Sequence, residues 1–196
     1  MKKLIIVTGV SGTGKTSLTK ELYNKIENSI LLSYDIISEG INDAIGFKDE
    51  EQKQSLRPLK KKIYKMLIEE CMKREDEVII LEKPFKEKWK VYLQKIIQKY
   101  NYEVYTINMF AKDFDTIWNR LLKREMSEEE RHPSHCLNSY YLKKKEEYKL
   151  HFGYDYNKLR DEYYGLVYNS INLGNIIAVE DIEVVETGEI IKQLMK

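Results

Sequence analysis

The sequence is poor in the features that mark disulfide-bonded, membrane-spanning or polyanion-binding proteins. Its two cysteines, Cys71 and Cys136, lie far apart and in no CxxC or CxxxH pattern, so neither a disulfide framework nor a structural zinc site is expected. The longest aliphatic runs have four residues and are too short to cross a bilayer. The 33 basic residues nearly equal the 32 acidic ones, which argues against polyanion binding through bulk charge. Because no signal peptide is recognisable either, we expect a cytoplasmic protein without membrane contact.

Short aliphatic runs alternate with longer amphipathic segments, and no linker or repeat divides the 196 residues. This alternation is typical of βαβ units around a parallel sheet, so the sequence predicts a single α/β domain. The first run is continuous, as expected for a strand that is covered on both faces. The expected strands are 4–7, 30–32, 78–81, 104–110 and 175–179. The segment 36–75 is predicted to be helical, with an apolar face formed by Leu56, Leu59, Ile63, Leu67 and Cys71.

The strongest motif is the segment 9–16, which matches G-x-x-x-x-G-K-[ST] and lies between an aliphatic run and an amphipathic segment. This is the phosphate-binding P-loop, in which glycines bring backbone amides close to phosphate oxygens. Lys15 is expected to bridge the β- and γ-phosphates, and the Thr16 hydroxyl is expected to ligate Mg²⁺. The expected nucleotide-binding residues are Gly9, Ser11, Gly12, Thr13, Gly14, Lys15, Thr16 and Ser17. The alternative is a glycine-rich turn that binds nothing.

Two further patterns would indicate a GTPase, but their contexts do not fit. The DxxG-like segment 43–46 follows no aliphatic strand, and the NKxD-like segment 24–27 ends in Glu inside the first predicted helix. The chain is also too short for a remodelling ATPase with a lid domain. A small kinase is therefore favoured among P-loop proteins.

The P-loop, Asp35 just after the second strand, and the Arg120/Arg124 pair after the fourth strand resemble P-loop kinases of the nucleoside-monophosphate-kinase-like fold. Within that group the layout is similar to the chloramphenicol phosphotransferase and zeta-toxin branch. The resemblance implies a five-stranded parallel sheet of order 2-3-1-4-5, ATP and Mg²⁺ as cofactors, and Asp35 as catalytic base. It also implies that Arg120 lies over the adenine ring and that Arg124 reaches the phosphates.

Two carboxylates follow predicted strands at the edge where ligands of doubly wound sheets bind. Asp35 is a candidate base for a substrate hydroxyl, and its alternative role is the N-cap of the next helix. Glu82 is a candidate to hold Mg²⁺ or to orient the substrate, and its alternative is a surface turn.

Basic residues supply the remaining candidates. Arg124 and Arg131, in or beside an expected lid at about 125–136, suit contact with a transferring phosphoryl group, although surface ion pairs with neighbouring glutamates are the alternative. Arg57 lies in the expected acceptor-binding helices at about 36–75, where it either contacts an anionic substrate or occupies a solvated helix face. His132 and His135 suit a lid hinge or substrate contact better than a metal site.

The segment 140–168 interleaves tyrosines with lysines, a composition that suits either nucleic-acid stacking or, as we favour, a half-buried helical pair. The sequence thus predicts an ATP- and Mg²⁺-dependent kinase that phosphorylates a hydroxyl group of a small molecule. The alternatives are a nucleotide or polynucleotide 5′-kinase, and a nucleotide-dependent interaction module without enzymatic activity. Nothing in the sequence sets the oligomeric state.

Overall fold

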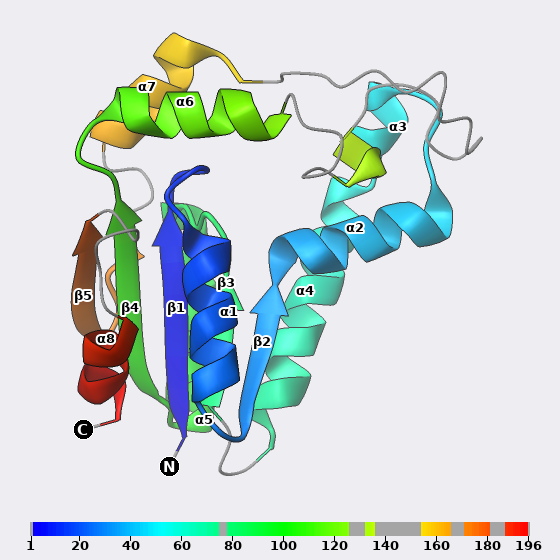
Figure 1. Ribbon diagram of the computed structural model, residues 1–196. Helices are drawn as coiled ribbons and strands as arrows, with labels where there is room; N and C mark the ends of the chain where they lie inside the picture. Colours follow the sequence, from blue (N-terminus) through cyan, green and yellow to red (C-terminus); the bar gives the residue numbers. More distant parts are fainter. Residues whose placement is uncertain are drawn as a thin grey trace.

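The structure, a computed structural model, describes residues 2–74, 78–125, 132–135, 154–165, 171–180 and 187–195. Five parallel strands form one sheet in the order β2-β3-β1-β4-β5, which confirms the predicted α/β fold and strand order (Figure 1). The strands are β1 (Lys3–Gly9), β2 (Ser29–Ser33), β3 (Val78–Glu82), β4 (Glu103–Phe110) and β5 (Asn175–Glu180).

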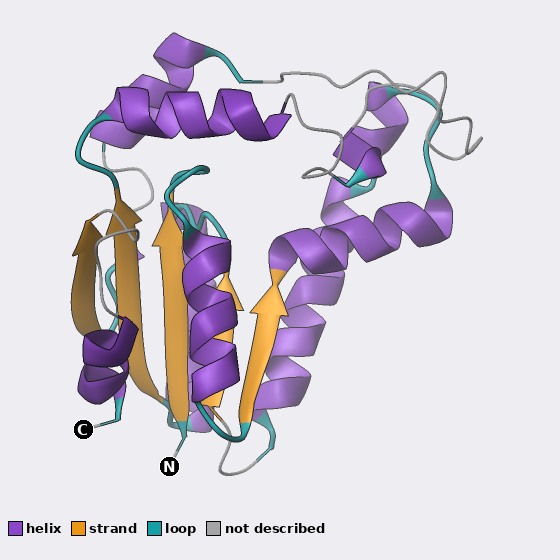
Figure 2. Cartoon of the chain, viewed as in Figure 1, coloured by secondary structure: helices purple, strands orange, loops and turns teal. Residues whose placement is uncertain are grey.

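Helices cover both faces of the sheet, as the cartoon in Figure 2 shows. They are α1 (Lys15–Lys25), α2 (Tyr34–Ile45), α3 (Glu50–Ser55), α4 (Arg57–Met72), α5 (Lys90–Tyr100), α6 (Phe114–Glu125), α7 (Tyr156–Tyr164) and α8 (Thr187–Leu194), with short 3₁₀ helices η1 (Glu87–Trp89) and η2 (Pro133–His135). Among the described residues, no helix is long and apolar enough to cross a membrane.

The continuous aliphatic run of β1 serves two cores at once. Leu4 and Ile6 pack with α4 and α5 on one face, while Ile5 and Val7 pack with α1 and α8 on the other. Every residue of β1 is buried, as expected for a central strand whose side chains alternate between two covered faces. The burial of β1 fixes the place where its last residue, Gly9, leaves the sheet.

The predicted apolar face of α4 is wrong by one position. The buried residues of this helix are Lys60, Tyr64, Ile68 and Met72, whereas Leu59 and Leu67 of the predicted face are 38% and 37% exposed. The prediction failed because the buried face includes Lys60. A pattern based on apolar residues alone therefore indicated the neighbouring positions instead. The predicted helical nature of 36–75 is otherwise confirmed by α2, α3 and α4.

Candidate active site

The loop between β1 and α1 can be built only with glycine at particular positions. Gly9 has φ +144°, and a Cβ there would overlap the carbonyl oxygen of Met109. Gly12 has φ +88°, and a Cβ there would lie 3.1 Å from Ile117 of α6. Gly14, with φ +85°, is the N-cap of α1. Left-handed backbone and close packing therefore both require glycine in this loop, which leads directly into the N-terminus of α1.

Lys15 is the first residue of α1 and is buried against the loop. Its Nζ donates a hydrogen bond to the carbonyl oxygen of Val10 at 2.8 Å, and the Thr13 hydroxyl donates to the same oxygen at 2.9 Å. Burial lowers the pKa of Lys15 to about 8; the Glu82 and Asp35 carboxylates oppose this shift, and Arg124 adds to it. The charges of Glu82, Asp35 and Arg124 thus all act on the Lys15 ammonium group. Ser11 is half-buried in the loop, and Ser17 is exposed in the first turn of α1.

Glu82 is the last residue of β3 and is only 3% exposed, so the alternative that it lies on a surface turn is wrong. The Thr16 hydroxyl donates a hydrogen bond to Oε1 of Glu82 at 2.5 Å, and the Thr19 hydroxyl lies 3.4 Å from Oε2. The strand register places Glu82 between Val7 of β1 and Ser33 of β2. Two side-chain oxygens, one from the first turn of α1 and one from the end of β3, are thus adjacent at the carboxyl edge of the sheet.

Asp35 lies in the first turn of α2, two residues after Ser33 ends β2. The alternative role as a helix cap is wrong, because Ser33 is the N-cap of α2 and no side chain caps it. Asp35 is exposed, and in the described part of the chain nothing donates a hydrogen bond to its carboxylate. The carboxylate is therefore available to a ligand.

Helix α6 crosses above the P-loop and carries two of the predicted arginines (Figure 1). Its position is fixed by an apolar cluster in which Val10 of the loop packs with Ile117 and Leu121 of α6. Arg120 and Arg124 project from this helix and are half-buried. The electrostatic effect of Arg124 on Lys15 shows that at least this arginine lies near the loop. Arg131 and most of the predicted lid at 125–136 lie outside the described residues.

A cavity of about 260 Å³ opens beside Asp35, between α2 and the α3–α4 pair. Its lining residues are mostly polar or charged, and they are Tyr34, Asp35, Ser38, Glu39, Asn42, Glu50, Lys53, Gln54, Arg57, Lys60, Ser134 and His135. Asp35 and Arg57 were predicted from the sequence, and the structure brings them to the same cavity. The other lining residues of α2, α3 and α4 were not predicted as site residues.

A signal for these missed residues does exist in the sequence. Asp35, Ser38, Glu39 and Asn42 follow the spacing i, i+3, i+4, i+7, and this spacing places them on one face of α2. The residues from Glu50 to Arg57 repeat the same spacing at the start of the next two helices. A search for polar faces, rather than for apolar ones, would have found both walls of the cavity.

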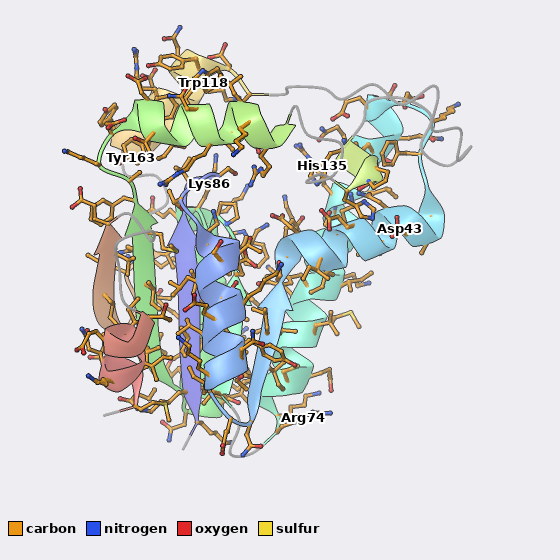
Figure 3. All side chains as sticks on the ribbon, in the orientation of Figure 1. Asp43, Arg74, Lys86, Trp118, His135 and Tyr163 are labelled. Atoms are coloured by element: carbon orange, nitrogen blue, oxygen red, sulfur yellow. The ribbon has the colours of Figure 1, made fainter. Side chains whose placement is uncertain are left out.

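The short segment 132–135 packs on α2 at this cavity (Figure 3). His135 lies 3.1 Å from a carboxylate oxygen of Glu39, and His132 lies 3.3 Å from Asp43. Ser134 is buried and accepts a hydrogen bond from Asn42 at 3.0 Å. Within the described ranges, no group of three or more histidine, cysteine, aspartate or glutamate side chains could hold a metal ion.

Lys83 is a buried lysine that the sequence analysis did not select. It follows Glu82 directly, and its Nζ lies 2.9 Å from the centre of the Tyr34 ring and 5.5 Å from that of Trp89. Burial lowers its pKa to about 7, a shift that the carboxylate of Asp35 partly opposes. The contact with Tyr34 links the end of β3 to the residue that precedes Asp35.

The described part of the tyrosine-rich segment 140–168 forms an apolar contact with α6. Tyr156 packs edge-on against Phe114 and Trp118, and the Tyr163 hydroxyl donates a hydrogen bond to the Ala111 carbonyl (Figure 3). Tyr156 and Tyr163 are thus half-buried against aromatic side chains of the protein itself, while the predicted helical pair lies largely outside the described residues. The lysines at 143–145 lie outside the described residues.

Comparisons with known proteins place this site in context. A family model described as an AAA domain matches residues 5–151, which include the P-loop, Asp35, Glu82 and both arginines of α6. No curated protein matches the chain. Among solved structures, a "putative kinase" from Chloroflexus aurantiacus is similar with a TM-score of 0.73 and 20% identity, covering 99% of this chain and 94% of that one. The tunicamycin resistance protein of Deinococcus radiodurans is similar with a TM-score of 0.57 and 12% identity over the same shares.

Proposed function

The chain belongs to the AAA domain family, and we propose that it is a kinase that transfers the γ-phosphoryl group of ATP to a hydroxyl group of a small molecule. The observation that carries this proposal is the cavity that opens at Asp35, within electrostatic reach of the P-loop lysine. A protein that only hydrolyses or binds ATP needs no second cavity there. A phosphotransferase needs one, because the acceptor must lie in line with the phosphoryl group.

In this proposal the loop amides and Lys15 hold the β- and γ-phosphates, since these are the positive groups on the concave side of the loop. Arg120 would contact the adenine, and Arg124 would approach the phosphates from α6. Asp35 would accept the proton of the acceptor hydroxyl as the new P–O bond forms and the bond to the β-phosphate oxygen breaks. Arg131 would join the site from the lid segment, and Ser11 and Ser17 would contact phosphate oxygens.

The donor set also fits a magnesium ion. Thr16 and Glu82 offer adjacent oxygens at the carboxyl edge of the sheet, and oxygen ligands are those that Mg²⁺ prefers. Thr16 would bind the ion directly, and Glu82 would hold it through a water molecule. When bound, the ion neutralises charge on the phosphate oxygens.

The test is acceptor-dependent formation of ADP. Wild type, Asp35→Asn and the control Asp161→Asn, which alters an exposed aspartate on α7, are incubated with Mg·ATP and a panel of alcohols, nucleosides and 5′-hydroxyl oligonucleotides. We expect some small alcohols to stimulate ADP formation by wild type and the control. Asp35→Asn should lose at least 10²-fold of this stimulated rate, because general-base catalysis typically contributes 10²–10⁴-fold, while it still binds a non-hydrolysable ATP analogue.

Two alternatives predict different results. A polynucleotide 5′-kinase would be stimulated by oligonucleotides and not by small alcohols. A nucleotide-dependent interaction module without enzymatic activity would bind ATP but form no ADP, whether or not an acceptor is present, and Asp35→Asn would leave ATP binding unchanged.

A further inference from the structure

The most unusual charge in the cavity is that of Lys60. Its side chain is 4% exposed and lines the cavity wall, yet among the described residues no carboxylate or other acceptor pairs with its ammonium group. Burial, together with the nearby charges of Lys53 and Arg57, lowers its pKa, and the charge of Glu50 only partly opposes this shift. A buried ammonium group without a partner is costly, so it calls for an anion that the protein itself does not supply.

The surroundings of Lys60 add to this positive charge. Lys60 and Arg57 both lie in the first turn of α4, and that turn contains no acidic residue. The N-terminus of a 16-residue helix carries partial positive charge, which ordinarily favours acidic side chains and disfavours basic ones. Two cations at this end therefore raise the electrostatic energy of the unliganded protein, and a bound anion would lower it.

The acidic residues of the cavity do not supply that anion. Glu50 lies 3.7 Å from Lys53 and accepts a hydrogen bond from Gln54, and Glu39 pairs with His135. Asp35 lies at the other wall, on α2, where it acts on Lys15 and Lys83. The α3–α4 wall of the cavity thus carries three cations, Lys53, Arg57 and Lys60, against one carboxylate, Glu50, and the α2 wall carries an accessible carboxylate, Asp35.

We propose that Lys60 and Arg57 form an anion subsite, and that the phosphate acceptor is an alcohol that carries a phosphate or carboxylate group. The hydroxyl of this acceptor lies at Asp35, and its anionic group lies at the start of α4. This inference rests on the proposed kinase function and specifies its substrate class. A cavity of about 260 Å³ lies at the small end of ligand sites, whose usual range is about 300–1,000 Å³. The acceptor is therefore a compact molecule.

The test measures anion binding while the P-loop is filled. The protein is saturated with Mg²⁺ and a non-hydrolysable ATP analogue, and inorganic phosphate or malonate is then titrated by calorimetry. We expect wild type to bind at least one of these anions, and Lys60→Met and Arg57→Gln each to weaken that binding tenfold or more. The control Lys62→Gln changes an exposed lysine of the same helix that does not line the cavity and should bind as wild type does.

The outcomes separate this inference from the proposed function. Tighter binding of phosphate identifies a phosphate ester as acceptor, and tighter binding of malonate identifies a carboxylate. If the analogue binds but neither anion does, or if Lys60→Met and Arg57→Gln bind both anions like wild type, the subsite is refuted while the kinase proposal stands. If the analogue itself does not bind, the proposed function and the subsite both fail.

Discussion

Lys15 is a cation whose charge changes within the range of ordinary buffers. Its pKa of about 8 results mainly from burial, so the ligand-free protein loses this charge as the pH rises above 8. In the proposed site, the ammonium form of Lys15 binds the triphosphate. We therefore expect the affinity for Mg²⁺ and a non-hydrolysable ATP analogue to fall by up to tenfold per pH unit above pH 8.

Calorimetric titrations between pH 7 and 9.5 measure this dependence. Lys15→Arg is the matched control, because a guanidinium remains charged throughout and its affinity should not change with pH over this range. Equal wild-type affinities at pH 7.5 and 9.5 would show either that Lys15 keeps its proton over this range or that it does not contact the phosphates.

The proposed role of Glu82 in holding Mg²⁺ depends on its carboxylate, which lies beside the Thr16 and Thr19 hydroxyls. Its carboxylate accepts the Thr16 hydrogen bond, so Glu82→Gln keeps the shape of the side chain and removes its charge. We expect this variant to need at least tenfold more Mg²⁺ for half-maximal ADP formation while remaining folded. Glu87→Gln, at an exposed position in η1, is the comparison. An unchanged Mg²⁺ requirement in Glu82→Gln would exclude the carboxylate from the metal site.

At the scale of elements, the approach of α6 to the P-loop depends on Gly12. An alanine there would adopt a left-handed conformation and press on Ile117 and Leu121. We expect Gly12→Ala to lower the free energy of unfolding by about 1–2 kcal/mol, the cost of a left-handed residue. It should also weaken ATP binding, since Arg120 and Arg124 move with α6.

Gly40 provides the matched control for Gly12. It lies inside α2, and a Cβ there would meet nothing within 4 Å. Gly40→Ala is therefore expected to raise the free energy of unfolding by about 0.5–1 kcal/mol, because alanine is the better helix former. Urea unfolding of both variants gives the comparison. If both substitutions changed the free energy of unfolding in the same direction, the close packing of Gly12 against α6 would not explain the need for glycine there.

Sequence patterns predicted the elements of this protein better than they predicted its cavity. Continuous aliphatic runs identified β1 and β3, because a strand buried on both faces tolerates few other residues. The P-loop was recognisable for a related reason, since its glycines are required by backbone geometry. The wall formed by Lys60 was missed because a buried lysine has no distinctive pattern, and its burial depends on how α2 and α4 pack together.

At the scale of the whole molecule, buried lysines link stability to pH. The pKa of Lys83 is about 7 and that of Lys15 about 8, both below the ordinary value of 10.5. Between these values and pH 10.5 the unfolded chain binds more protons than the folded one, so stability should rise with pH. We expect Lys83→Met to be more stable than wild type near pH 6. Its free energy of unfolding should rise less steeply with pH than that of wild type, by up to about 1.4 kcal/mol per pH unit.

Urea unfolding at pH 6 to 9.5 measures both slopes. Lys20→Met, which changes an exposed lysine of α1, should keep the wild-type slope. If Lys83→Met also kept it, Lys83 would have an ordinary pKa in the folded protein.

Transfer of phosphate to a bound alcohol is the claim on which the functional account depends. Its most direct measurement is ³¹P nuclear magnetic resonance of the wild-type protein with Mg·ATP and a mixture of neutral, phosphorylated and carboxylated alcohols. We expect a new phosphate-ester resonance that grows in step with ADP and is absent with Asp35→Asn. Release of inorganic phosphate alone, at a rate that the alcohols do not change, would contradict it.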